Sequence, residues 1–131
     1  MTQPATKMPS VQPLLYQRLG GYDAIAAIID DFLARQRADP QLARFGLGRS
    51  DDSRRKGRQL LVDQLCALAG GPCLYVGRDM KTSHQGLGIS EDDWDRTIII
   101  LRASMAAQGV SPTEQDEVVA LWTQYKAEIV E

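Results

Sequence analysis

Helical periodicity constrains this chain more than any other feature, because apolar residues recur on one helical face through most of its length. In the first periodic stretch they stand at i, i+3, i+4 and i+7: Ile25, Ile28, Ile29 and Phe32, with Leu33 beside them. This spacing is typical of a helix that buries one face. It predicts a helix from about Tyr22 to Arg37 that ends before Asp39-Pro40, since the residue before a proline avoids the α region.

Three further long helices follow from the same periodicity. Residues 54 to 69 carry Leu61, Leu65 and Leu68 on one face, and Gly70-Gly71-Pro72 ends the helix. The next helix starts at a capping-box-like Ser90 and Asp93 and extends to Gly109, with an apolar face of Trp94, Thr97, Ile98, Leu101 and Met105.

The last predicted helix has Ser111 as its N-cap and Pro112 at its first position. Its buried face is Val118, Leu121, Trp122, Tyr125 and Ile129. No stretch alternates apolar and polar residues for long enough to indicate a strand. The sequence therefore predicts an all-α domain of four long helices with shorter ones between them.

Composition limits the class of protein. The 131 residues have a mass of 14.5 kDa, with 15 basic against 17 acidic side chains and a formal net charge of -2. This length predicts one globular domain, and the charge gives no overall basic field for nucleic acid. Residues 1–13 hold three prolines and little large apolar surface, so we expect a flexible tail there and a domain over 14–131.

The two cysteines and the apolar runs bear on location. Cys66 and Cys73 have no metal-ligand spacing, and we interpret both as reduced thiols. The longest apolar run, residues 98–101, is too short for a membrane span, and the N-terminus lacks the features of a signal peptide. We therefore predict a cytoplasmic protein with no membrane partner.

Residues 75–89 contain the only histidine, His84. Met80 lies four residues earlier, so on a helical turn both side chains point the same way. A solvated or capping histidine and a single axial haem ligand with Met80 beside it both fit this spacing. A zinc site, a Ser-His-Asp triad and a Cys-His nucleophile lack supporting residues, and neither phosphate-loop motif occurs.

Several motifs, taken together in order and spacing, resemble the group 1 truncated haemoglobins over residues 14 to 130. They are Leu15-Tyr-Gln-Arg-Leu-Gly-Gly-Tyr22, Asp31-Phe32, Ala38-Asp39-Pro40, Gly70-Gly71-Pro72, Tyr75-x-Gly-Arg-x-Met-Lys-x-x-His84-x-Gly-x-Gly-Ile89 and Gly109-Val110. The resemblance implies a globin-like two-over-two helical sandwich around one non-covalent haem b. It also implies that His84 is the iron ligand, with Nδ1-H on a backbone carbonyl.

The resemblance further implies a set of haem-contacting residues: Phe32, Leu33, Phe45, Leu61, Leu65, Tyr75, Arg78, Met80, Lys81, His84, Ile89, Trp94 and Ile98. Arg78 and Lys81 are placed to reach the haem propionates, although solvated side chains are the alternative. For Phe32, Phe45, Tyr75 and Trp94 the alternative is ordinary core packing.

The distal residues depart from the family pattern, because Leu33 stands where many members place a tyrosine hydroxyl. Counting back from Gly70-Gly71 puts Gly57 and Leu61 at the other distal positions, whereas counting forward from Phe45 puts Gln59 at the second of them. We prefer the backward count because loops tolerate insertions better than helices do. Gln64 is a third candidate donor.

The function implied is reversible binding of dioxygen, CO and NO, with a role in oxygen transport. An NO dioxygenase, a catalyst of peroxide or reactive-nitrogen detoxification, and a haem-based gas sensor are the alternatives. Peroxidase chemistry would require a distal acid/base, and the chain has no second histidine. We expect five-coordinate reduced iron with Lys56 as the only nearby amine, a reductase partner in the enzymatic case, and a monomer or weak homodimer.

Overall fold

The computed structural model describes residues 13–131, and most of the predicted tail lies outside the described residues. The elements are α1 (Leu15–Leu19), α2 (Tyr22–Ala38), the 3-10 turn η1 (Ala43–Gly46), α3 (Asp51–Leu68), α4 (Met80–His84), α5 (Glu91–Ala107), α6 (Pro112–Thr123) and α7 (Lys126–Ile129). Residues 13–131 contain no strand, and the four long helices are those that the periodicity predicts.

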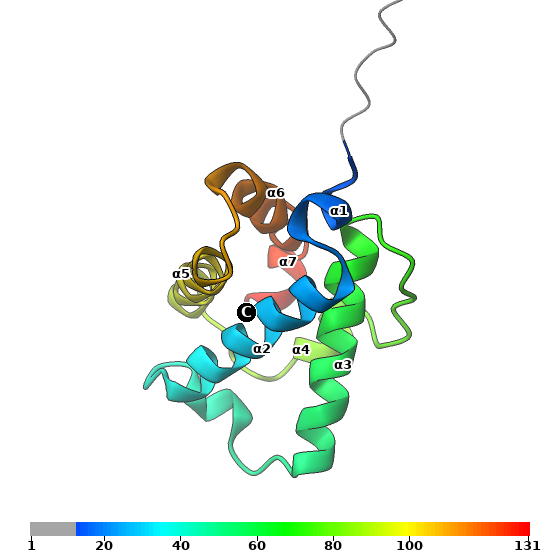
Figure 1. The fold of residues 1–131 in the computed structure, drawn as a ribbon. Helices are drawn as coiled ribbons and strands as arrows, with labels where there is room; N and C mark the ends of the chain where they lie inside the picture. Colours follow the sequence, from blue (N-terminus) through cyan, green and yellow to red (C-terminus); the bar gives the residue numbers. More distant parts are fainter. Residues whose placement is uncertain (1–12) are drawn as a thin grey trace, which may run out of the picture.

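The helices are arranged around α2, which lies between α3 and α5 (Figure 1). α5 packs on α6, α1 touches both α2 and α6, and the short α4 packs against α7. One helical pair, α2 with α3, thus meets a second pair, α5 with α6. The core where they meet is aliphatic, with the largest fully buried side chains Ile25, Ile28, Ile29, Leu42, Leu65, Leu101 and Met105.

Side-chain caps set where two of the long helices begin. The Ser90 hydroxyl accepts a hydrogen bond from the Asp93 backbone N–H, and the Asp93 carboxylate accepts one from Ser90, which confirms the predicted capping box. Ser50 caps α3 in a similar way, so this helix begins at Asp51, three residues before its predicted start. Ser111 makes no such bond to the backbone and instead donates to the Glu114 side chain.

The last predicted helix is interrupted, contrary to the sequence prediction. α6 ends at Thr123 and α7 begins at Lys126. The Thr123 hydroxyl donates to the Val119 carbonyl and the Gln124 amide to the Leu121 carbonyl, at 2.6 and 2.7 Å. Such side-chain bonds compete with the backbone ladder and disturb helices. The break changes the direction of the segment that ends at Ile129.

Cys66 and Cys73 form a disulfide, so the interpretation as reduced thiols was wrong. After α3 the chain turns back at Gly70-Gly71, which brings the two Cα atoms to 5.7 Å. A Cβ on Gly71 would lie 2.4 Å from the Tyr16 ring and 2.7 Å from the Cys66 sulfur. The tight return therefore needs glycine, and it is this return that makes the cross-link possible.

Candidate haem site

A cavity of about 560 Å³ lies between α2, η1, α3, α4, α5, α6 and α7. Its walls are largely apolar and come from elements far apart in the sequence, among them Phe32, Leu33, Leu42, Phe45, Leu61, Ile89, Trp94 and Trp122. Phe32 and Trp122 meet edge to face with ring centroids 5.4 Å apart. A space of this size and character is typical of small-molecule and cofactor sites.

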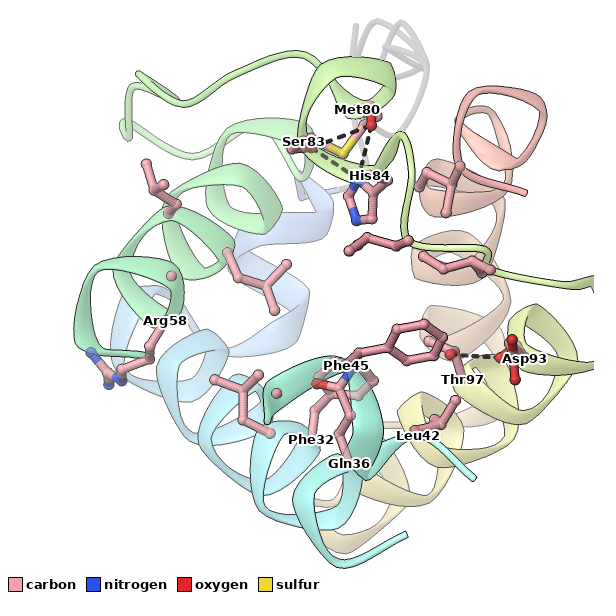
Figure 2. A pocket seen from close by; sticks show the side chains of 18 of the residues that line it. Phe32, Gln36, Leu42, Phe45, Arg58, Met80, Ser83, His84, Asp93 and Thr97 are labelled. Atoms are coloured by element: carbon pink, nitrogen blue, oxygen red, sulfur yellow. Dashed lines mark hydrogen bonds between the residues drawn. The ribbon is translucent and has the colours of Figure 1, made fainter. Parts of the chain in front are cut away.

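His84 points into this cavity from α4, opposite Phe32, Gln36 and Phe45 (Figure 2). Its Nδ1 lies 2.8 Å from the Met80 carbonyl oxygen and 2.9 Å from the Ser83 hydroxyl. A carbonyl oxygen only accepts, so the Nδ1 nitrogen carries the proton and donates it to Met80. In the neutral ring the Nε2 nitrogen then keeps its lone pair, which is the arrangement that ligates a metal.

The elements on both sides of His84 fix the position of α4. Before it, the Asp79 side chain accepts a hydrogen bond from the Thr82 backbone N–H, and hydrogen bonding from the Thr82 side chain and then from its backbone N–H holds the pKa of Asp79 below its usual value. After it, the Glu131 carboxylate accepts hydrogen bonds from the backbone N–H groups of Gly86 and Gly88, at 2.5 and 2.9 Å. Both glycines have positive φ, 81° and 68°, which other residues rarely adopt.

Most of the residues expected to contact the cofactor line the cavity: Phe32, Leu33, Phe45, Leu61, Tyr75, Met80, His84, Ile89 and Trp94. Four do not. Leu65 is fully buried in the core, and Ile98 follows Thr97, which takes the cavity-facing position on α5. Arg78 lines a shallow neighbouring pocket, and Lys81 lines neither. Successive helical residues differ by about 100°, so one residue of offset turns a side chain away.

The cavity also has lining residues that the sequence analysis did not assign to it. They include Gln36, Leu42, Leu60, Leu87, Thr97, Trp122, Tyr125 and Ile129. The sequence did indicate burial for Trp122, Tyr125 and Ile129, because they stand at i, i+3 and i+7 on the predicted buried face of the final helix. That periodicity shows a buried face without showing whether it packs on protein or on a cavity.

The two glutamine candidates for the distal donor lie in different surroundings. Gln59 is exposed, and its amide donates to the Tyr22 hydroxyl and to Asp63, at 2.9 and 3.1 Å. Gln64 lines the cavity with 9% exposure, and its amide donates to the Met80 sulfur at 3.1 Å. Gly57 and Leu61 both line the cavity, in agreement with the count made back from Gly70-Gly71. The Gln64 amide thus already has a partner on α4.

One wall of the cavity contains a buried acid, Asp93, with 2% exposure. It accepts hydrogen bonds from the Ser90 backbone, from the Gln41 amide at 2.9 Å and from Arg44 at 2.6 Å. These donors hold the pKa of Asp93 far below its usual value. Asp93 therefore stays ionised and ties the segment before η1 to the start of α5.

Comparison with known proteins identifies the family. The family model described as bacterial-like globin matches residues 14–131. The chain is 34% identical over 105 residues to the group 1 truncated haemoglobin GlbN of Mycolicibacterium paratuberculosis, covering 80% of this chain and 75% of the relative. This chain belongs to the group 1 truncated haemoglobins. A second truncated haemoglobin, GlbN of Nostoc sp., is 31% identical over 116 residues, which are 88% of this chain and 96% of that protein.

Solved structures agree with this truncated haemoglobin assignment. The 2/2 hemoglobin of Synechococcus sp., solved in the cyanomet state with covalently attached heme, superposes with a TM-score of 0.81 at 25% identity. The ferric truncated haemoglobin of Tetrahymena pyriformis gives 0.82 at 24% identity. Each match covers 90% of this chain and 98% of the other. The fold is the all-helical two-over-two globin fold, as predicted.

The haemoglobin relatives imply a haem, and the residues of this truncated haemoglobin fit one. The cavity offers a wall of aromatic and aliphatic side chains for an apolar macrocycle and one imidazole nitrogen with a free lone pair. Arginine side chains at its edge suit carboxylates. No helix among residues 13–131 is long and apolar enough to span a membrane.

Proposed function

We propose that this truncated haemoglobin binds one haem b non-covalently through His84 and reversibly binds dioxygen, CO and NO at the iron. The observation that carries the proposal is the His84 ring, held by the Met80 carbonyl with Nε2 directed to the cavity. Bound haem supplies the affinity for diatomic gases. The chain's part is to hold the iron, exclude water and leave space for a ligand.

The cavity walls support a site with little polar assistance to the gas. Leu33 and Leu61 are apolar, and one N–H of the Gln64 amide is bonded to Met80. With no donor at positions 33 and 61, we expect rapid release of dioxygen, since a hydrogen bond to a charge-bearing partner is worth about 1.5–3 kcal/mol. The oxygenated form should therefore be short-lived, and a role in oxygen transport would depend on this rapid release.

Five-coordinate reduced iron is part of the proposal. Lys56, the amine considered from the sequence, is 75% exposed and pairs with Asp52 at 3.0 Å. It lines the shallow pocket rather than the cavity that His84 faces. These contacts leave it directed to solvent and support an open sixth position at the iron.

A second candidate function is NO dioxygenation, in which NO and dioxygen become nitrate with the consumption of one electron per turnover. The observation that favours it is a group of arginines at the cavity edge, Arg37, Arg49 and Arg54, which suits the approach of an acidic electron donor. Nitrate formed in proportion to NO consumed, in the presence of a reductant, would establish this activity.

The test of haem binding is substitution of His84. Wild-type protein mixed with haemin should show a Soret band and a ferrous spectrum of the five-coordinate type. His84→Ala should lose the haem or keep it only with added imidazole, whereas the matched variant Gln85→Ala, at an exposed position outside the cavity, should keep the wild-type spectrum. A His84→Ala protein with an unchanged Soret band would refute the ligand assignment.

A monomer or weak homodimer completes the proposal, whereas the disulfide bears against the cytoplasmic location expected from the sequence. Structural disulfides persist mainly in oxidising compartments and are rare in the cytosol. The Cys66–Cys73 bond therefore argues against a reducing cytoplasm. Thiol trapping with an alkylating reagent in intact cells, followed by mass analysis, would show which form is present.

A further inference from the structure

Four of the six described arginines and lysines that lack an acidic partner line two neighbouring pockets. Among the described residues, Arg37, Arg49, Arg54, Arg55, Arg78 and Lys81 have no carboxylate within ion-pair distance. Every other arginine and lysine from residue 13 onward does have one. Arg37, Arg49, Arg54 and Arg78, which line these pockets, form what we call the cationic rim. All four are exposed.

The cationic rim borders the entrance of the haem cavity. Arg37, Arg49 and Arg54 line the cavity itself, and Arg78 lines the shallow pocket beside it. The two spaces share the lining residues Arg49, Gly57 and Leu60 and are therefore neighbours, and the Arg49 guanidinium lies over Gly57, where a Cβ would be 2.8 Å from its Nη2. Arg55 follows Arg54 on α3 but lines neither pocket.

The positive charge of this region contrasts with the rest of the chain. Residues 44–58 carry six basic side chains, Arg44, Arg49, Arg54, Arg55, Lys56 and Arg58, and two acidic ones, although the whole chain has a net charge of -2. A bound haem would add two negative propionates, which are fewer than the unpaired cations and so would not neutralise this region. Beside Arg49, the side chain of Leu47 is 76% exposed. An apolar residue among charged ones is typical of a transient protein interface.

We propose that the cationic rim is the docking surface for an acidic electron-transfer protein that reduces the ferric haem. The proposal rests on the haem-binding function above. One electron passes from the donor, for example from anionic flavin hydroquinone, which becomes the neutral semiquinone; no bond forms or breaks. The rim positions the donor at the cavity entrance, where the covering helices leave an opening, and its field accelerates the encounter.

An acidic protein fits this surface better than nucleic acid does. The rim is one localised patch on a chain whose remaining surface is acidic, so an extended polyanion such as a DNA duplex would also meet repulsive charge. A small acidic protein meets only the rim and its exposed leucine. Nucleic acid remains one outcome of the test.

The experiment uses flavodoxin, a small acidic FMN protein, as the probe. Stopped-flow spectroscopy follows reduction of the haem-loaded ferric protein by flavodoxin hydroquinone at low and high salt. The rim variant is Arg49→Glu with Arg78→Glu. The matched control is Arg35→Glu with Arg102→Glu, which changes the net charge equally at ion-paired arginines outside the rim. The Soret band first establishes that each variant holds haem.

The bimolecular rate constant of the wild type should fall as the salt concentration rises. At low salt the rim variant should react at least about tenfold more slowly than the wild type, and the control should stay within about twofold of it. Calorimetric titration with oxidised flavodoxin should show the same order of affinity. Photoreduced deazariboflavin, which is uncharged, should reduce all three proteins alike.

Equal rates in the rim variant and the control would overturn the proposal. So would a 20-base-pair duplex that binds the wild type more tightly than flavodoxin does at the same salt. Absence of a Soret band in the wild type would instead contradict the haem function, and the flavodoxin titration would still report on the docking surface.

Discussion

The Cys66–Cys73 disulfide closes the loop that leads from α3 to the helix carrying His84, and its loss has a calculable cost. The bridge encloses a short loop, with a sequence separation of 7. In the chain-entropy model a loop of this size stabilises the folded state by about 2.5 kcal/mol at 25 °C. We therefore expect Cys73→Ala to lower the free energy of unfolding by about that amount. Cys73 is the better position to change because Cys66 is fully buried.

Urea denaturation at pH 7, followed by circular dichroism, measures this free energy in wild type and variant. A thiol-free reductant such as a phosphine should destabilise the wild type by a similar amount and leave Cys73→Ala unchanged, which separates the cross-link from the packing of the sulfur. The rate of haem transfer to excess apomyoglobin should also rise, because the loop before α4 then depends on weaker contacts, such as the 2.8 Å bond from the Gly71 N–H to the Cys66 carbonyl.

A destabilisation below about 0.5 kcal/mol, with no effect of reductant on the wild type, would refute this reasoning. It would mean that the loop is equally ordered without the bridge, or that the bridge does not form.

Three further predictions concern the cavity and its supports. Leu33→Tyr should slow dioxygen release about ten- to a hundredfold in stopped-flow measurements, whereas Gln59→Leu, at an exposed site, should change little; a large effect of Gln59→Leu would contradict the helical register. The donors around Asp93 lower its pKa in the folded protein. They therefore stabilise the fold fully at pH values above the pKa of Asp93 in the unfolded chain, which is about 4, and stabilise it less as the pH falls below that pKa. Asp93→Asn should thus cost about 1.5–3 kcal/mol at pH 7 in urea unfolding, and a deficit equally large at pH 3 would count against this account. Glu131→Gln removes one acceptor of the bonds that hold the loop after His84, so haem transfer to apomyoglobin should speed up several-fold; Glu128→Gln, on exposed α7 surface, should not change it.

The sequence by itself determined the features that depend on neighbours within one or two helical turns. The one-sided spacing around Ile25 and Phe32 defines α2, and the Ser90 and Asp93 pair defines the start of α5. These are local because the helical repeat and the capping bonds join residues three or four apart. His84 and Met80 could likewise be placed on one turn, and the Nδ1 bond to a backbone carbonyl follows the expectation from the family resemblance.

Only the tertiary structure decided which residues meet across the chain. Periodicity cannot tell whether Gln59 or Gln64 faces the cavity, since a shift by one position turns a side chain by about 100°. Nor can it show that the Gly70-Gly71 turn brings Cys73 back to Cys66, or that Arg37, Arg49 and Arg78 line two neighbouring pockets. These outcomes depend on the path of the chain between helices, which is fixed by packing between elements distant in sequence.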